Sequence, residues 1–258
     1  MTYYPTLPRL AVVLSLSVSP DEARPLLAAA CEAARTSTPD IEAWAGSART
    51  FAAPDADNMF AGRPIGAKVD AVIEVTGTPG GGPEQLLEAA RRIGETLSGF
   101  AIADESDVVL GTAYCAKSGK SRAALVMTFS RDRRTDEKTF LHWWQLHHSR
   151  FNLHSPTGHP ASRGFVSYQL LSRDDALSQA AATASGFRSG YDMYESIFVD
   201  DPVRYIADVV ASGHGTAALH DEEGFLSHEW RIGTPEQARQ ARENGRDLMR
   251  IAMLEVVA

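Results

Sequence analysis

RAALVMTF (122–129), followed by DEKTFLHWWQLHHSRF (136–151), is the stretch that decides the fold. The first segment is short and apolar, which predicts a β-strand. The second is amphipathic, with acidic residues in its first turn and Thr135 as the expected N-cap, which predicts a helix. The same order occurs near the N-terminus, where AVVLSLSV (11–18) precedes a predicted helix over 21–35. The chain therefore carries one arrangement twice.

After these two strand–helix pairs, both copies continue with the same order of elements. The first adds a strand within 41–51, a strand at 67–75, a helix at 83–97 and a strand at 107–115. The second adds strands at 164–171 and 191–199, a helix near 202–211 and a strand within FLSHEWRI (225–232). Both orders are β-α-β-β-α-β, the ferredoxin-like α+β unit. We expect units at 1–117 and 121–258, linked by KSGKS (117–121), with a C-terminal helix and an edge strand in the tail.

A β-α-β-β-α-β unit has both helices on one face of an antiparallel sheet, so its other face needs a partner. Two units in one chain can cover each other. The expected fold class is therefore α+β, with two ferredoxin-like units forming one α+β barrel.

The amino-acid composition limits the classes of binding partner that the protein is expected to have. The formal net charge of −8 and the absence of a dense Lys/Arg run argue against a nucleic-acid groove or an anionic membrane surface. No apolar stretch reaches the roughly 18 to 20 residues of a spanning helix. The run from Leu10 to Val18 is followed by Asp21 and Glu22, so it predicts a strand and not a signal peptide. A small-molecule substrate is the expected partner, and a homodimer remains one option.

The two cysteines, Cys31 and Cys115, form no CxxC pair, and this fits a reducing, cytoplasmic setting. GxGxxG after a strand, a P-loop and GxSxG are all absent from the sequence. These absences argue against a nucleotide cofactor and a serine hydrolase.

The histidines are distributed unevenly. None precedes position 142, and they stand at positions 142, 147, 148, 154, 159, 214, 220 and 228. If the halves are structural copies, the first is mainly a scaffold and the second carries the polar chemistry. The spacing of these histidines matches no compact zinc pattern, so no metal site is expected.

On a regular helical wheel, Phe140, Trp144, His147 and Phe151 share one arc, and His148 flanks it. In the simpler interpretation the aromatic side chains pack on the sheet and the imidazoles make ordinary hydrogen bonds. In the functional interpretation one imidazole points into a cavity and transfers protons, because only histidine titrates near neutrality without perturbation.

Other polar aromatic side chains could reach such a cavity. In YDMYESIFV (191–199) strand alternation places Tyr191 and Tyr194 on opposite faces, so either face presents a phenol. Tyr168 lies on the predicted strand 164–171, and His228 lies on the predicted strand 225–232. Buried tyrosines are more often core residues with a hydrogen-bonded hydroxyl than catalytic acids, and the same alternative holds for His228.

The second half resembles the EthD family, a branch of the dimeric α+β barrel group. The resemblance covers roughly residues 121–232 and rests on matching positions after the first strand. These positions are Phe140, the pair Trp143-Trp144, His148, the pair Tyr191-Asp192, and Asp221, Glu222 and Phe225. The sequence departs from the family pattern at Ser196, where an acidic residue is expected and Glu195 precedes it. The first half resembles a diverged copy by element order alone.

The resemblance implies the fold directly and the chemistry loosely. We expect a cofactor-independent enzyme that acts on an aromatic or polyketide-like molecule by histidine-mediated proton transfer, as a lyase or dehydratase, a cyclase or an isomerase. His148 is the expected general acid/base and His147 the alternative. Substrate-binding positions are expected at Phe140, Trp144, Phe151, Tyr168, Tyr191, Tyr194 and His228.

Two other functions stay open at this point. One is a haem-binding monooxygenase or peroxidase-like protein with a histidine ligand, in which the haem is noncovalent because no CxxCH motif is present. The other is a non-enzymatic protein that binds a small molecule unchanged.

Overall fold

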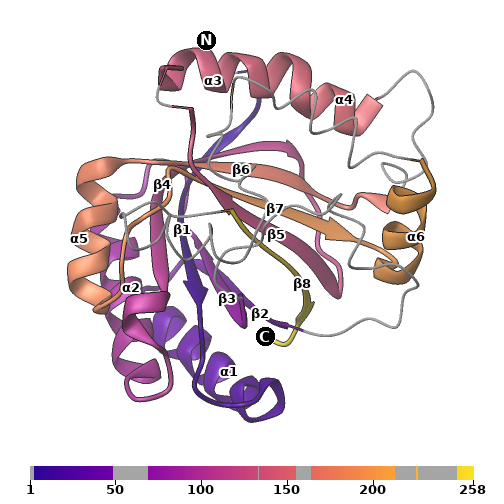
Figure 1. The fold of residues 1–258 in the computed structure, drawn as a ribbon. Coiled ribbons are helices and arrows are strands. Elements are labelled where there is room, and N and C mark those ends of the chain that lie inside the picture. The colour runs from indigo at the N-terminus through magenta and orange to yellow at the C-terminus, as the bar shows by residue number, and fades with distance from the viewer. Residues whose placement is uncertain (1–2, 49–68, 133, 155–163, 213–224, 226–248) are drawn as a thin grey trace.

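A computed structural model describes residues 3–48, 69–132, 134–154, 164–212, 225 and 249–258 of the chain. Eight antiparallel strands form one closed barrel in the order β1-β3-β2-β8-β5-β7-β6-β4 (Figure 1). The first half contributes β1 (Thr6–Leu14), α1 (Pro20–Ser37), β2 (Glu42–Ala48), β3 (Ala71–Thr76), α2 (Pro83–Leu97) and β4 (Asp107–Lys117).

The second half begins with β5 (Ala123–Phe129) and α3 (Glu137–Trp143), which runs through a π-helical turn (Trp144–His148) into α4 (Ser149–His154). It continues with β6 (Tyr168–Arg173), α5 (Asp175–Ser185), β7 (Met193–Val199), α6 (Pro202–Ser212) and β8 (Arg250–Val256).

Each half forms a four-stranded ferredoxin-like sheet, ordered β4-β1-β3-β2 in the first and β8-β5-β7-β6 in the second. The two sheets meet at two seams. The β4–β6 seam runs from Gly111 opposite Arg173 to Lys117 opposite Tyr168, and the shorter β2–β8 seam pairs Gly46–Ala48 with Val256–Leu254. The predicted α+β barrel of two units in one chain is confirmed.

Strand alternation divides the apolar side chains into three clusters. Leu10, Val12 and Ile73 belong to a cluster that packs the outer face of the first sheet against α1, α2 and α5. Leu125, Leu170 and Ile197 belong to the corresponding cluster under α3 and α6. The third cluster fills the barrel interior. Helices therefore cover the outside of both sheets (Figure 1), and each half has an interface between its helices and its sheet.

Two expected elements differ from the structure. The last strand of the second half is β8, which pairs with β2 and β5 on its two sides and so is not an edge strand. The expected strand within FLSHEWRI lies outside the described residues, except for Phe225.

The Ala/Ser-rich segment before β7 forms a helix, α5, which begins at the N-cap Asp174 and ends at Gly186 with φ 77°. It packs on α2 of the first half so closely that a Cβ on Gly94 would lie 2.2 Å from the carbonyl oxygen of Ser185. Ser178 anchors α5 to β4, because its hydroxyl bonds both the N–H and the C=O of Leu110 at 2.8 Å. The helix α5 of the second half is therefore packed against both α2 and β4 of the first half.

None of the helices in the described part of the chain combines the length and the apolarity needed to cross a bilayer.

Candidate functional site

The π-helical turn decides which histidine faces the sheet. Asp136 caps α3 by accepting from the Thr139 N–H at 2.8 Å, so the N-cap lies one residue after the predicted Thr135. A π turn takes more residues than an α turn. The buried face therefore passes from Trp144 to His148 and not to His147.

His148 is 6% exposed, whereas His147 is exposed and Phe151 is half-buried. The regular helical wheel, which grouped His147 and Phe151 with Trp144, is wrong here because the π turn contains one more residue than an α turn. The observed face consists of Phe140, Trp144, His148 and Asn152, all of them buried.

Asn152 ties His148 to the sheet. Its amide nitrogen lies 3.0 Å from His148 Nε2 and donates to the Tyr168 hydroxyl on β6, also at 3.0 Å. An amide nitrogen only donates, so His148 Nε2 accepts, and the imidazole in this arrangement is neutral with its proton on Nδ1. The ring also packs on Trp143, with 4.8 Å between ring centroids.

Glu195 on β7 supplies a carboxylate opposite the helix. It is 2% exposed, and its Oε1 accepts from the Trp144 indole N–H at 3.0 Å. Its neighbour Ser196 belongs to the set of residues that face the barrel interior, as strand alternation requires. The carboxylate of this strand therefore lies on the helix-facing side of the sheet, at Glu195 and not at position 196.

His148 and Glu195 line the same enclosed cavity between helix and sheet. Its volume is about 10 Å³, and the rest of its wall is mainly apolar: Met127, Phe129, Trp143, Trp144 and Met249. A space of this size holds about one water molecule. The site thus brings an imidazole and a carboxylate to one small void inside an apolar cluster.

The structure brings some of the predicted site residues together and separates others. Phe140, Trp144, Tyr168 and His148 share the cluster under α3 or lie at its edge. Tyr191 and Tyr194 belong to the cluster inside the barrel, on the other side of the sheet. His228 lies outside the described residues, as do His159, His214 and His220 and the side chain of His154. Phe225, from the same predicted strand as His228, stacks on Trp143 at 4.3 Å and 6°.

Asn152 and Glu195 were not among the predicted site residues. Asn152 stands four positions after His148, which is a helical contact distance. Glu195 is a single acid within an apolar strand, and Glu74 in AVIEV has the same signature. An isolated charge in a buried strand was the signal available for both carboxylates.

A haem at His148 does not fit the described residues. A porphyrin needs a pocket of several hundred Å³, whereas the cavity beside the imidazole is about 10 Å³. In addition, Asn152 occupies the ring nitrogen Nε2. Within the described residues, no three His, Cys, Asp or Glu side chains are grouped so that they could hold a metal ion.

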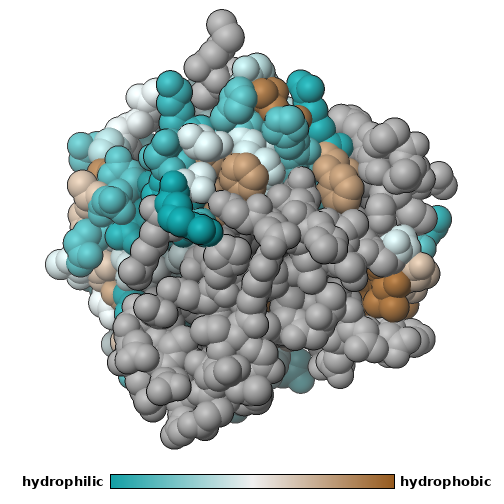
Figure 2. All heavy atoms as spheres, turned by 45° about the horizontal axis from the view of Figure 1, so that its top comes forward, coloured by the Kyte–Doolittle hydropathy of each residue, from teal (hydrophilic) through white to brown (hydrophobic). Residues whose placement is uncertain are grey.

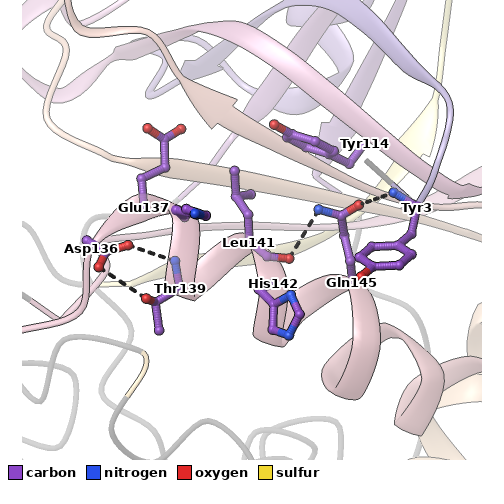
Figure 3. A pocket seen from close by; sticks show the side chains of 9 residues that line it. Tyr3, Tyr114, Asp136, Glu137, Thr139, Leu141, His142 and Gln145 are labelled. Carbon is purple, nitrogen blue, oxygen red and sulfur yellow. Dashed lines mark hydrogen bonds between the residues drawn. The ribbon is translucent and has the colours of Figure 1, made fainter. Parts of the chain in front are cut away.

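A larger hollow of about 700 Å³ lies beside α3, between the helix and the N-terminal segment (Figure 3). Tyr3, Tyr114, Glu137 and His142 are among its lining residues. Its buried polar side chain, Gln145, makes hydrogen bonds within the chain, accepting from the Tyr3 N–H at 2.8 Å and donating to the Leu141 carbonyl at 3.2 Å. The described residues on the face that carries α3 are mostly hydrophilic, with a few apolar side chains among them (Figure 2).

No protein-family model matches the chain, and no curated protein matches it. Solved structures share its fold at very low sequence identity. One, a "putative monooxygenase" from Fusobacterium nucleatum subsp. nucleatum, has 7% identity and a TM-score of 0.51, over 100% of this chain and 94% of its own.

Two further structures align at lower TM-scores. A "putative monooxygenase" from Lactobacillus acidophilus NCFM has 10% identity and a TM-score of 0.48, over 98% of this chain and 95% of its own. A chlorite dismutase from Candidatus Nitrospira defluvii has 9% identity and a TM-score of 0.45, over 99% of this chain and 93% of its own. At these identities the likeness shows the fold alone. The shared fold is a closed eight-stranded α+β barrel, which this chain forms within one polypeptide.

Proposed function

We propose that the second half is an EthD-like enzyme unit that acts on a small, flat, largely apolar and partly oxygenated molecule by proton transfer, without an organic cofactor. The observation that carries this proposal is the enclosed cavity that His148 and Glu195 share. Buried polar and charged groups in an apolar cluster reduce stability, so they are concentrated at functional sites.

The two groups divide the proton transfer between them. His148 in the tautomer set by Asn152 is neutral, and a neutral imidazole can both accept and donate a proton. Glu195 is oriented by the Trp144 indole and adds a second proton acceptor on the opposite wall. Because the surroundings are apolar, hydrogen bonds to a developing enolate or phenolate are stronger there than in water. Lyase, cyclase and isomerase reactions share this step.

A substrate needs more room than the closed cavity offers. Apolar side chains, among them Met127 and Phe129, form much of the wall beside the void, and Phe225 covers Trp143. Displacing Met127 and Phe129 costs mainly apolar contacts. We therefore propose that substrate binding opens this wall, which places the aromatic body of the substrate against Trp143 and Trp144.

Deuterium exchange tests the proposal without knowledge of the product. The protein is incubated in D₂O with a panel of hydroxylated naphthoquinones, naphthols and β-diketones, and protein-dependent incorporation of deuterium at carbon is measured by mass spectrometry. We expect a compound whose exchange is lost, by about 100-fold or more, in His148→Ala and in Glu195→Gln. His147→Ala is the matched control, because His147 is exposed on the same helix, and it should exchange at the wild-type rate.

The alternatives give different outcomes. Binding of panel compounds without any exchange would support the non-enzymatic binding protein and contradict the enzyme. In a haem titration followed by absorption, we expect no stoichiometric ligated spectrum that depends on His148. A ligated spectrum lost in His148→Ala and kept in His147→Ala would show that the haem interpretation is right.

A further inference from the structure

A second pocket opens at one end of the barrel, away from the His148 cavity. Its volume is about 370 Å³, which is within the range of small-molecule sites. Its lining residues lie near the starts of β1, β2 and β6, near the ends of β3, β4 and β7, and in the adjoining segments 77–79 and 118–120; Asp40, which precedes β2, also lines it. In an antiparallel barrel these strand ends meet at the same mouth. We call this space the mouth pocket.

The inner polar wall of the mouth pocket is a buried ion pair. Arg9 Nη1 lies 3.2 Å from Glu74 Oε1, and the two side chains are 5% and 3% exposed. The Trp44 indole N–H donates to the same Glu74 oxygen at 3.0 Å. Arg9 is held in turn by Thr76, whose hydroxyl accepts from Arg9 Nε at 3.1 Å. The carboxylate is thus fixed in position by two donors on one of its oxygens.

One polar atom of the pocket lining, Glu74 Oε2, makes no hydrogen bond of normal geometry with the described residues, although Glu74 is only 2% exposed. The Tyr194 hydroxyl and Ser196 Oγ are also buried, but they lie outside the pocket lining, within reach of each other and of Glu74. Burial raises the pKa of Tyr194 well above its ordinary value, and the negative charge of the neighbouring Glu74 raises it further. Unpaired buried polar atoms are rare in folded proteins, and one that lines a pocket is a candidate contact for a ligand.

The chemistry of the wall defines that ligand. A carboxylate oxygen only accepts, so Glu74 Oε2 is complementary to an O–H or N–H donor. Three acidic side chains line the pocket, Asp40, Glu42 and Glu74, against the two basic side chains Arg9 and Lys120. Arg9 is neutralised by Glu74, and Lys120 lies 3.0 Å from Glu42 at the rim. The pocket therefore disfavours an anion.

The remaining wall is apolar and aromatic. Trp44 and Phe198 meet edge to face at 4.9 Å, and Leu7 and Pro79 also line the pocket. Aromatic walls of this kind favour a flat apolar body.

We propose that the mouth pocket is a second binding site, which takes a small aromatic molecule bearing a neutral hydroxyl or a protonated amino group directed at Glu74. It is independent of the proposed proton-transfer site, because Glu74 faces the barrel interior whereas Glu195 faces the helices outside the barrel.

A cysteine in the pocket wall gives a direct test. Cys115 lines the mouth pocket, donates to Gln169 Oε1 at 3.5 Å and is half-buried. Cys31 is the other cysteine of the chain, and it is fully buried. Burial raises the pKa of both thiols, that of Cys31 to about 11. Alkylation by iodoacetamide, followed for each cysteine by peptide mass spectrometry, therefore reports pocket occupancy at Cys115 and unfolding at Cys31.

The probes share one phenyl body and differ in the head group: 2-phenylethanol, 2-phenylethylamine, phenylacetate and toluene. At saturation we expect the alcohol or the amine to slow Cys115 alkylation by about 5-fold or more, and phenylacetate and toluene by less than about 2-fold. The proposal is overturned if neither donor protects Cys115, in which case the Tyr194 hydroxyl or ordered water satisfies Glu74 Oε2. It is also overturned if phenylacetate protects as well as the donors do.

Two variants separate binding from folding. In Glu74→Gln, protection by the amine should fall about 10-fold in apparent affinity, since the charge partner is lost; unaltered affinity would contradict the proposal. Because Glu74→Gln leaves Arg9 unpaired, the variant is interpreted only while Cys31 remains unreactive. Ser118→Trp places a bulky side chain at the exposed rim and should abolish protection with Cys31 still unreactive. Full protection in Ser118→Trp would place the ligand elsewhere.

Discussion

The ion pair between Arg9 and Glu74 lies almost entirely out of solvent, so its two members depend on each other. Removing one leaves the other as an uncompensated buried charge, which typically destabilises a protein by about 3–5 kcal/mol. We expect this loss in the free energy of unfolding of Glu74→Ala, measured by urea denaturation. The double variant Arg9→Met/Glu74→Leu should be far closer to wild type, because no charge is left buried.

Ion pairs on the surface contribute less to stability than the buried pair Arg9–Glu74, because they are exposed to solvent. Glu88 bonds Arg91 and Arg92 on the outer surface of α2. Water screens such pairs, and their net contribution is small. Glu88→Ala is therefore the control for Glu74→Ala, and a similar loss in both variants would contradict the interpretation.

Asn152 holds two buried partners with one amide group. We expect Asn152→Leu to lower the free energy of unfolding by about 1–3 kcal/mol, because the His148 nitrogen and the Tyr168 hydroxyl each lose a hydrogen-bond donor. Tyr168→Phe removes only the hydroxyl and keeps the ring, so its loss should be smaller, near 1 kcal/mol. Equal losses in the two variants would show that the His148 contact contributes nothing.

At the scale of elements, the π turn has a simple sequence origin. Between Trp144 and Asn152 the chain has one residue more than a regular helix needs to keep both on one face. Deleting the exposed His147 should let a regular α-helix form with Trp144, His148 and Asn152 still facing the sheet. We expect the variant to fold with unchanged or higher thermal stability and reduced exchange activity, since π turns are frequent at functional sites. Inserting an alanine after His147 instead adds a second extra residue, which should turn His148 and Asn152 away from the sheet and lower stability.

The wheel placed His147, and not His148, beside Trp144, because it assumed a uniform 100° per residue. A one-residue change of helical phase depends on how the helix packs against Glu195 and Tyr168, and these contacts are remote in sequence. The sequence did indicate the helix, its aromatic face and the presence of an inward imidazole. The resemblance favoured His148, which is the buried one.

The close contact between α2 and α5 should make a glycine-to-alanine substitution in α2 destabilising, although such a substitution usually stabilises a helix. A glycine within a helix is usually improved by alanine, by about 0.5–1 kcal/mol. At Gly94 the added Cβ would lie 2.2 Å from the Ser185 carbonyl oxygen, so α5 must shift. We expect Gly94→Ala to destabilise by about 1–3 kcal/mol, the usual range for overpacking, in chemical denaturation. Glu95→Ala, on the neighbouring exposed position, should behave like wild type.

For the whole molecule, the repeated element order predicted two ferredoxin-like sheets and their closure into a barrel, because each sheet has one face without helices. The prediction placed the strand that closes the barrel within residues 225–232, whereas in the structure this strand is β8. The segment Arg250–Val256 was expected at a sheet edge, yet it pairs with a strand on each side. In addition, the buried Arg250 donates to the Glu105 carbonyl oxygen and to the hydroxyl of Ser15, the residue that follows β1. Which of several apolar segments closes a ring depends on long-range pairing across both halves, and local periodicity carries no information about it.

Closure within one chain has a consequence for the separated halves. Each half alone exposes the barrel-facing side of its sheet and two unpaired edges, at the β4–β6 and β2–β8 seams. Exposed edges and apolar faces drive aggregation or pairing. We expect fragments 1–119 and 120–258, cut in the link between β4 and β5, to be aggregated when expressed separately and to form a 1:1 complex when expressed together. Size-exclusion chromatography with light scattering measures this. A monodisperse, folded 1–119 fragment on its own would show that the barrel interior is not required to stabilise the first half, and the two units would then be independent domains.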